Sequence, residues 1–234
     1  YTFHLWFLYY LALITFCSVI IAFILAKTPK ISRYISKIFN WTIKQSLLRV
    51  LIFAGITSIC YYIMGTWSVI TSTSFIPDLN MFIYYFSFYI IGWVLYKSKH
   101  FLDSFMKYDY LSVFLAITLF SIYFFMNYHF SFLFHVVLKS IIVWLFVFGI
   151  TGLFVRHTSN YSPLMRYLSD ASYWVYLVHV SFMAIIPGFI SAWLIPATFK
   201  FLFVFVVSSF LSFLSYHYFV RGTFIGKFLN GRKY

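Results

Sequence analysis

The sequence has very little acid and very little charge of any kind. It contains no Glu and only four Asp (Asp78, Asp103, Asp109 and Asp170), and charged residues make up 9% of its 234 residues. A soluble domain typically carries about 25% charged residues. Because 63% of the residues are apolar, the chain cannot hide its apolar surface in a soluble core, and lipid is its expected solvent. The composition therefore excludes an ordinary soluble globular protein.

Cysteine is also scarce, and several enzyme signatures are missing. The two cysteines, Cys17 and Cys60, fall inside apolar stretches, so we predict neither a disulfide framework nor a metal site. There is no GxSxG, Walker, GxGxxG, HExxH or CxxC pattern. The last apolar segment has no Lys half-way along it, which argues against a retinal protein. No pair of helices broken by Gly and Pro marks an inverted-repeat transporter.

Long apolar runs dominate what is present. A bilayer core of ~30 Å needs ~20 mostly apolar residues in a helix. Such segments are His4–Ala26, Ser46–Gly65, Met81–Tyr96, Tyr110–Met126, Phe132–Phe154, Tyr173–Ile195 and Phe199–Val220. Only helices and closed barrels span lipid, and these runs are too long for barrel strands. We therefore predict an all-α integral membrane protein, a bundle of seven transmembrane helices that forms a single domain over residues 1–234.

The basic residues alternate between the connections of these spans. Seventeen Lys and Arg give a formal net charge of +13. They gather after the first, third and fifth spans and in the tail, whereas the other connections hold only Lys200. By the positive-inside rule this pattern places the N-terminus outside and the C-terminus in the cytoplasm. The same pattern explains the positive net charge, so we expect membrane lipid and not nucleic acid as a partner.

The first basic connection carries an amphipathic pattern. Within the segment Lys30–Lys44, apolar residues recur at helical spacing, with Lys37 and Lys44 on the other side. The apolar positions are Ile31, Tyr34, Ile35, Ile38 and Trp41/Thr42. Such a pattern is typical of a helix that lies in the membrane interface.

Ionisable residues at membrane depth are candidate functional residues because placing charge in lipid is costly. His179 lies about two helical turns from the cytoplasmic end of the sixth span. It suits a proton carrier or an orienting donor, and the alternative is a bundle histidine satisfied by a neighbouring polar group. His4 opens the first span close to Trp6. The alternative for His4 is an ordinary histidine at the outer interface, and the alternative for Trp6 is a place in the outer aromatic belt.

Further charged residues are candidates for substrate binding. Lys139 shares a helix face with His135 and either snorkels outward or meets an anionic substrate group. Asp78, the only acid on the outer side, orients a histidine, binds a hydroxyl or caps the third span. Arg156 and Arg166 suit phosphate binding at the cytoplasmic face, although the positive-inside rule alone also explains them.

Other polar residues are expected to be structural. Arg49 lies one turn inside the second span and is expected to snorkel to the cytoplasm. Asp170 precedes the sixth span and is expected to cap it. The serines of the seventh span, from Ser208 to Ser215, are expected to pack helices together.

Four stretches together resemble acyltransferase family 3, and the likeness runs the length of the chain. They are His4–Leu11, the pair Ile76–Leu79 and Phe88–Tyr96, Tyr167–His179, and Val220–Arg232. The third is typical of the whole family, and the first and fourth are most similar to the branch that succinylates periplasmic glucans. The resemblance implies a multi-pass enzyme of the bacterial inner membrane. It would transfer an acyl group from a cytoplasmic acyl-CoA-type co-substrate to a periplasmic or surface glycan, without a bound cofactor.

The chain departs from this family at its start. The resemblance implies a catalytic pair in the family's first span, an Arg followed about three helical turns later by a His. No Arg of this chain has a His at that spacing. The seven spans correspond to the family's last seven and the chain begins with Tyr1 rather than Met, so we expect the first three spans to be missing. The resemblance assigns pocket-lining or orienting roles to His4, Trp6 and His179.

The leading prediction is therefore a membrane O-acyltransferase that acts on a glycan, with succinyl as one acyl group that the resemblance suggests. A polytopic transporter or flippase for a glycan or lipid-linked substrate is the first alternative. It would use His179 and Lys139 to couple substrate or proton movement. A structural or receptor-like protein without chemistry is the second alternative, and it predicts that the polar residues share no cavity.

Overall fold

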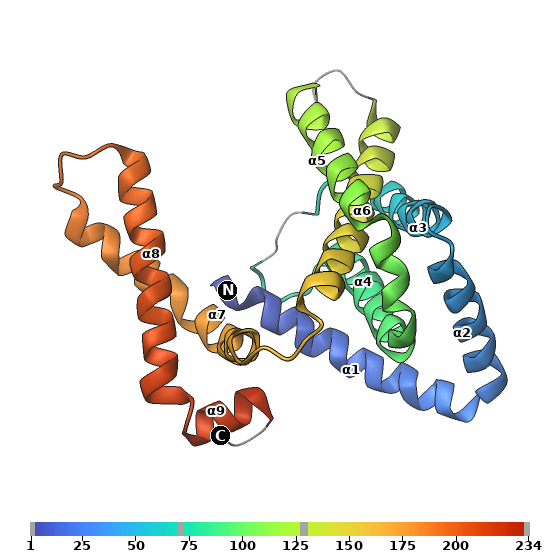
Figure 1. Ribbon diagram of the computed structural model, residues 1–234, viewed down its shortest axis with the longest axis horizontal. Coiled ribbons are helices and arrows are strands. Elements are labelled where there is room, and N and C mark those ends of the chain that lie inside the picture. Colours follow the sequence, from blue (N-terminus) through green and yellow to red (C-terminus); the bar gives the residue numbers. More distant parts are fainter. Residues whose placement is uncertain (1–2, 70–72, 127–130, 232–234) are drawn as a thin grey trace. The chain divides into compact units, whose positions relative to one another are not determined.

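The computed structural model describes residues 3–69, 73–126 and 131–231 (Figure 1). Over these residues the regular structure is entirely helical. The helices are η1 (Phe3–Leu5), α1 (Trp6–Lys27), α2 (Pro29–Lys44), α3 (Leu48–Met64), α4 (Leu79–Lys97), the 3-10 helix η2 (Lys99–Tyr108), α5 (Asp109–Met126), α6 (Phe132–Thr158), α7 (Pro163–Ile190), α8 (Ala197–Ser215), the π-helical turn η4 (Tyr216–Val220) and α9 (Phe224–Asn230). The predicted cation-poor loop at 127–130 and the tail cations Arg232 and Lys233 lie outside the described residues.

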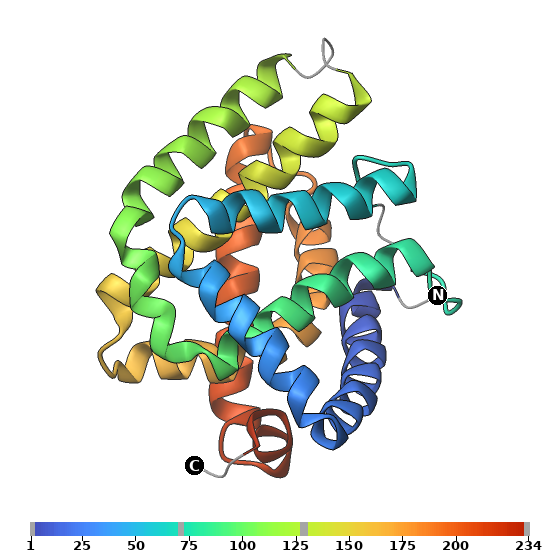
Figure 2. The ribbon, with the colours of Figure 1, turned by 90° about the vertical axis from the view of Figure 1, so that its right-hand side faces the viewer.

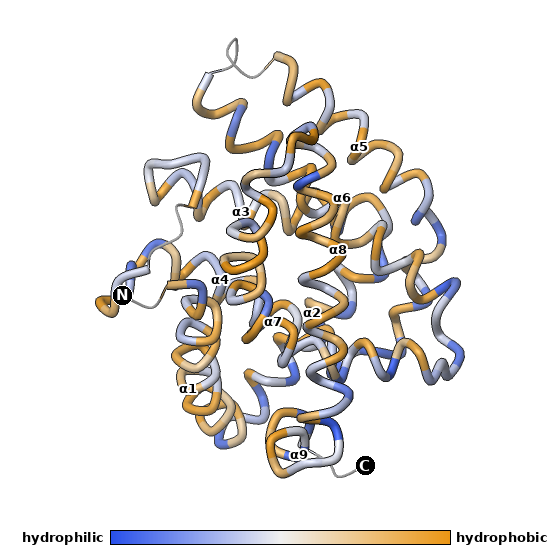
Figure 3. Tube along the Cα trace, turned by 90° about the vertical axis from the view of Figure 1, so that its left-hand side faces the viewer, coloured by the Kyte–Doolittle hydropathy of each residue, from blue (hydrophilic) through white to orange (hydrophobic). Residues whose placement is uncertain are grey.

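Six of the helical segments are long and apolar enough to cross a membrane. They are Phe3–Lys27, Leu79–Lys97, Lys99–Met126, Phe132–Thr158, Pro163–Ile190 and Ala197–Val220. Figure 3 shows apolar residues along the length of these helices, as in α1. The predicted second span is the apolar helix α3, whose 17 residues cover only ~25 Å at ~1.5 Å per residue. The all-α membrane class is confirmed, whereas seven spans and the orientation of the termini stay predictions.

The helices pack into two compact units, residues 1–160 and 161–234, and we describe each by itself. In the first unit α6 is the central helix, because it packs against α3, α5 and η2. α5 and α6 form an antiparallel pair (Figure 2). Trp144 of α6 anchors the core: its ring stacks on Phe53 and Phe88 at centroid distances of 4.9 and 5.1 Å. Its Nε1 donates to Thr57 Oγ1 at 2.8 Å, which joins α6 to α3.

Two glycines allow the close contacts of α6. A Cβ at Gly149 would lie 2.7 Å from Val113 Cγ2 on α5. A Cβ at Gly152 would lie 2.6 Å from the carbonyl oxygen of Phe105 and 2.7 Å from Cβ of Asp109. No side chain fits at these distances, so glycine sets the approach of α6 to α5 and η2.

Arg49 lies inside the first unit, where only 1% of it is exposed. Its Nη1 donates to the carbonyl oxygen of Ile43 at 3.2 Å and to the carbonyl and hydroxyl oxygens of Ser104 at 3.3 Å. The guanidinium lies 4.5 and 5.2 Å from the ring centres of Phe105 and Phe148. The expectation that Arg49 snorkels outward is wrong, because these oxygens and rings hold the cation inside the bundle. Its buried Nε has no hydrogen-bond partner among the residues that the structure describes.

In the second unit α7 and α8 form a hairpin. Trp174 Nε1 donates to Ser215 Oγ at 2.9 Å, and Ser208 and Ser212 are buried, so the predicted packing role of these serines is confirmed. α7 begins ten residues before the predicted span, because Ser162 caps it and Pro163 occupies its first turn.

Asp170 therefore lies inside α7, not before it. The expectation that it caps the sixth span is wrong, since the capping position belongs to Ser162. α7 also ends at Ile190 instead of Ile195. The extra turns at its start carry Pro163, Arg166, Tyr167 and Asp170, which help to line the cavity described below.

Candidate functional site

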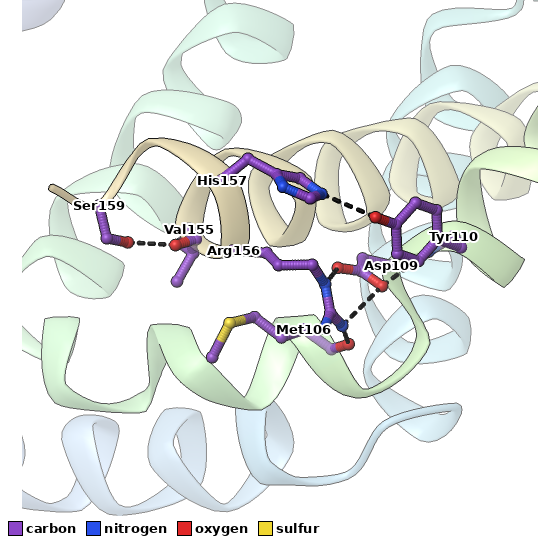
Figure 4. Close-up of polar contacts among 7 residues, drawn as sticks. All are labelled: Met106, Asp109, Tyr110, Val155, Arg156, His157 and Ser159. Carbon is purple, nitrogen blue, oxygen red and sulfur yellow. Dashed lines mark hydrogen bonds and ion pairs between the residues drawn. The ribbon is translucent and has the colours of Figure 1, made fainter. Parts of the chain in front are cut away.

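At one end of the first unit, Arg156 of α6 is paired with Asp109 at the start of α5 (Figure 4). Nε donates to Oδ2 at 2.6 Å, Nη2 donates to Oδ1 at 3.1 Å, and Nη2 also donates to the carbonyl oxygen of Met106. Asp109 is 2% exposed, whereas the Arg156 side chain is 38% exposed. Beside the pair, the Tyr110 hydroxyl and His157 Nε2 are 2.7 Å apart. The arginine predicted to bind a phosphate thus has a fixed carboxylate partner and keeps only its Nη1 donors for other ligands.

Sequence reasoning assigned no role to Asp109. The pairing joins residues 47 positions apart, and no local pattern links them. Four Asp in a chain of 234 residues is the signal that points to each of them, because an acid at the edge of an apolar helix needs a partner.

A second group of polar contacts joins the start of α1 to the start of α4. The backbone N–H of Asp78 donates to the hydroxyl of the buried Tyr10 at 2.8 Å. Asp78 Oδ1 accepts from the backbone N–H of Met81 at 2.8 Å, which is the predicted N-cap of α4. The Tyr9 hydroxyl donates to the carbonyl oxygen of Phe75 at 2.8 Å. This end is therefore held together by tyrosine hydroxyls.

Trp6 and His4 lie at the same end. Trp6 is half-buried, with its ring 5.8 Å from that of Tyr85 on α4. His4 is half-buried in η1, one short turn before Trp6. A cavity of about 190 Å³ begins beside Trp6. It is lined by Trp6, Phe7, Tyr10, Leu11, Ile14, Tyr85 and Tyr89. Trp6 therefore lines the same aromatic cavity as Tyr10, the residue that is hydrogen-bonded to Asp78.

Lys139 belongs to a separate cluster at the start of α6. Its Nζ donates to the carbonyl oxygen of Trp67 at 3.0 Å and lies 5.5 Å from the ring centre of Tyr123. His135 is one turn earlier on the same face, with Nδ1 3.0 Å from the Tyr123 hydroxyl. The Trp67 ring stacks on His135 at 5.2 Å. Lys139 and His135 thus meet one tyrosine, as their spacing predicts.

The second unit holds His179 and Arg166, both on α7. His179 Nδ1 lies 2.7 Å from the carbonyl oxygen of Tyr176 and 3.1 Å from that of Val175. A carbonyl oxygen only accepts, so Nδ1 carries a proton and the neutral ring has its lone pair on Nε2. Arg166 is exposed. It lies ~20 Å from His179 along the helix at ~1.5 Å per residue, so these two residues do not share one cavity.

Arg166 lines a cavity of about 210 Å³, which we call the basic pocket. Its lining residues are Tyr161, Pro163, Arg166, Tyr167, Asp170, Tyr216 and Arg221. The Arg221 guanidinium lies 5.5 Å from the ring centre of Tyr167. The Tyr216 hydroxyl accepts from Asn230 Nδ2 at 3.1 Å. Guanidinium groups bind phosphate groups, and aromatic rings pack against flat rings. The Asp170 carboxylate in the same lining repels anions and so opposes phosphate binding.

Arg221 was not among the predicted site residues. It lies directly after η4, where the chain turns into α9. A Cβ at Gly226 of α9 would lie 2.4 Å from the carbonyl oxygen of Val220, so this turn needs glycine. The Arg-Gly pair at 221–222 in the tail stretch that resembles the family was the available signal.

The comparisons with known proteins identify the family. No curated protein and no solved structure matches the chain. The model of an acyltransferase domain, acyltransferase family 3, matches residues 1–217, which includes residues of both units. The matched residues include the first three of the four stretches from which the resemblance was inferred, and the fourth, Val220–Arg232, lies beyond them. The chain therefore belongs to acyltransferase family 3, a family of membrane acyltransferases.

Proposed function

We propose that this chain transfers an acyl group, with succinyl as the first to test, from a cytoplasmic acyl-CoA-type donor to a periplasmic or surface glycan in a bacterial inner membrane. Its membership of acyltransferase family 3 supports acyl transfer, and its apolar helices support a membrane location. The observation that supports the donor site is the basic pocket, where Arg166 and Arg221 lie with three tyrosine rings. A coenzyme A donor offers phosphates for the guanidinium groups and a flat adenine for the rings.

The acceptor side rests on the aromatic end of the first unit. Trp6, Tyr85 and Tyr89 line a cavity there, and Tyr10 ties it to Asp78. Aromatic faces combine an apolar body with polar edges, which suits the mixed surface of a sugar ring. We assign Trp6 and Asp78 to the acceptor side and Arg166 and Arg221 to the donor side.

The reaction needs a group that takes the proton of the acceptor hydroxyl. The hydroxyl oxygen attacks the thioester carbon, the new C–O bond forms, the C–S bond breaks, and the proton passes to the leaving thiol. A histidine whose Nδ1–H is held by a carbonyl can accept a proton at Nε2, and His179 has that arrangement. His4 is the second candidate, on the acceptor side, and Lys139 and Arg156 are candidates for contacts to an anionic acyl group.

Donor binding is tested with the gene at its chromosomal locus. Membrane vesicles from strains with Arg166→Gln or Arg221→Gln are given radiolabelled succinyl-CoA, and label in the glycan fraction is measured. Lys200→Gln is the matched control, because Lys200 Nζ donates to the carbonyl oxygen of Ser191 at the other end of the second unit. Loss of a charge-assisted contact should raise the donor KM roughly 10-fold or more. An unchanged KM in both arginine variants would refute the donor assignment, and glycan movement without acyl transfer would favour a flippase.

A further inference from the structure

The amphipathic helix α2 (Pro29–Lys44) has one face that holds it to the first unit. Ile43 is fully buried, and the Phe39 ring lies 5.9 Å from that of Phe53. The Ser98 hydroxyl donates to Asn40 Oδ1 at 2.5 Å. At ~100° per residue, Ser32, Ser36, Phe39 and Ile43 follow one side of the helix. This side fixes how α2 is turned about its own axis.

A second face is apolar and exposed. It consists of Ile31, Tyr34, Ile35, Ile38 and Trp41, each between 41% and 67% exposed. These side chains cover an arc of about 120° at ~100° per residue. Thr42 is the polar residue of α2 whose direction falls within that arc, and it is buried. The exposed side chains of the arc therefore form a continuous apolar strip.

A third face is cationic and borders the apolar strip. It consists of Lys30, Arg33, Lys37 and Lys44, all exposed. Their directions fall within an arc of about 60°. α2 contains no acid, and Asp78 is the first acid of the whole sequence. The positive charge of this face is therefore not balanced by any acid on the same helix.

The neighbours of α2 place it at a membrane surface. α1, an apolar helix long enough to span, ends at Lys27, only two residues before α2 begins. The apolar helix α3 begins at Leu48, four residues after α2 ends. A helix tied this closely at both ends to apolar helices stays within reach of the headgroups.

We propose that α2 binds the surface of a leaflet that contains anionic lipid, with Ile31, Ile35 and Ile38 inserted below the headgroups. Lys30, Arg33 and Lys37 then lie against lipid phosphates. Charge complementarity selects this occupant: an exposed apolar strip bordered by unbalanced cations matches an anionic lipid surface. The side of α2 that packs on the first unit, through Phe39 and Ile43, fixes the rotation of the helix. In this rotation the apolar strip enters the lipid and the cationic face lies beside it at the headgroups.

The depth of individual side chains tests the proposal in the full chain. Cys17→Ser and Cys60→Ser remove the native thiols, and spin labels are then placed at Ile38→Cys or, as the matched control, at Lys37→Cys one position earlier. The protein is reconstituted in nanodiscs of phosphatidylcholine with or without phosphatidylglycerol. Accessibility to oxygen, which prefers lipid, is compared with accessibility to a nickel chelate, which stays in water.

With phosphatidylglycerol we expect the oxygen-to-nickel accessibility ratio at position 38 to be at least threefold that at position 37. Equal ratios at both positions would overturn the proposal. So would protection of position 38 from both reagents, since that result means that protein covers the strip.

The anionic preference is tested separately. Binding of spin-labelled phosphatidylglycerol relative to phosphatidylcholine is measured for Arg33→Gln/Lys37→Gln, with Lys200→Gln as the control outside α2. We expect at least a twofold loss of preference in the double variant alone. The same preference in both proteins, or none in the unchanged chain, would overturn the role of the cationic face.

Discussion

Asp109 and Arg156, 47 positions apart, form a two-pronged ion pair that fastens the start of α5 to the end of α6. The carboxylate is almost fully covered, whereas the arginine is partly open. Membrane interiors leave such an acid few partners, so removing the guanidinium leaves a covered charge without its counterion. The pair therefore bears on both the stability of the first unit and the predicted substrate role of Arg156.

Replacing either residue should destabilise the protein. Comparing the two variants separates the role of the pair in stability from a role of Arg156 in substrate binding. Asp109→Asn and Arg156→Gln should each lower the Tm by roughly 3–6 °C, measured by thermal unfolding in detergent. If Arg156 also binds an anionic substrate, Arg156→Gln raises the KM of the acyl donor or acceptor while Asp109→Asn does not.

Two further variants complete this test. The double variant should lose less stability than the sum of the single variants, because the two residues share one interaction. Arg156→Lys should not restore the Tm, since an ammonium cannot make both contacts. Additive losses would contradict the view that the pair acts as a unit.

The sequence predicts the positions of the apolar helices well, because each needs only a long apolar run. It misses η2, where Lys99, Asp103 and Lys107 suggest a solvated loop. Phe105 of η2 is nevertheless fully buried beside α6, so tertiary packing and not local pattern decides this segment. It also misses the first turns of α7, although Ser162 and Pro163 are a recognisable helix start.

The candidate site is less predictable than the fold for the same reason. His179, Arg166 and Trp6 are candidates that the sequence proposes from their residue types and depths. Asp109 and Arg221 are not, because their partners lie 47 and 54 positions away in the sequence. Only the packed helices bring these groups together.

The contact between α6 and η2 predicts opposite effects of alanine at two glycines of the first unit. Gly152→Ala places a methyl group within 3 Å of backbone and of Asp109, and should destabilise by about 1–3 kcal/mol through overpacking. Gly92→Ala is the matched control in α4, because nothing lies within 4 Å of its Cβ position. It should be neutral or slightly stabilising. Thermal unfolding of both variants is the measurement, and equal Tm values would contradict the close contact.

Asp78 offers a way to separate a cap from a substrate contact. Asp78→Asn keeps an oxygen for the Met81 N–H and should retain the Tm, because Asn and Asp are equally good N-caps. Asp78→Ala should cost about 1 kcal/mol. If the carboxylate also binds a glycan hydroxyl, Asp78→Asn raises the acceptor KM without lowering the Tm. An unchanged KM would leave Asp78 with the capping role alone.

His179 gives the sharpest test of the chemistry, because its tautomer is fixed by the carbonyl oxygen of Tyr176. His179→Asn keeps an N–H near the Nδ1 position but removes the lone pair at Nε2. If that lone pair takes the acceptor proton, acyl transfer should fall by roughly 10²–10⁴-fold while the Tm and the donor KM stay near their starting values. His100→Asn is the matched control, at an exposed position in η2, and should leave transfer unchanged. A Tm loss that parallels the activity loss would instead mark His179 as a packing residue. Full activity in His179→Asn would remove it from the reaction and leave His4 as the remaining histidine to test.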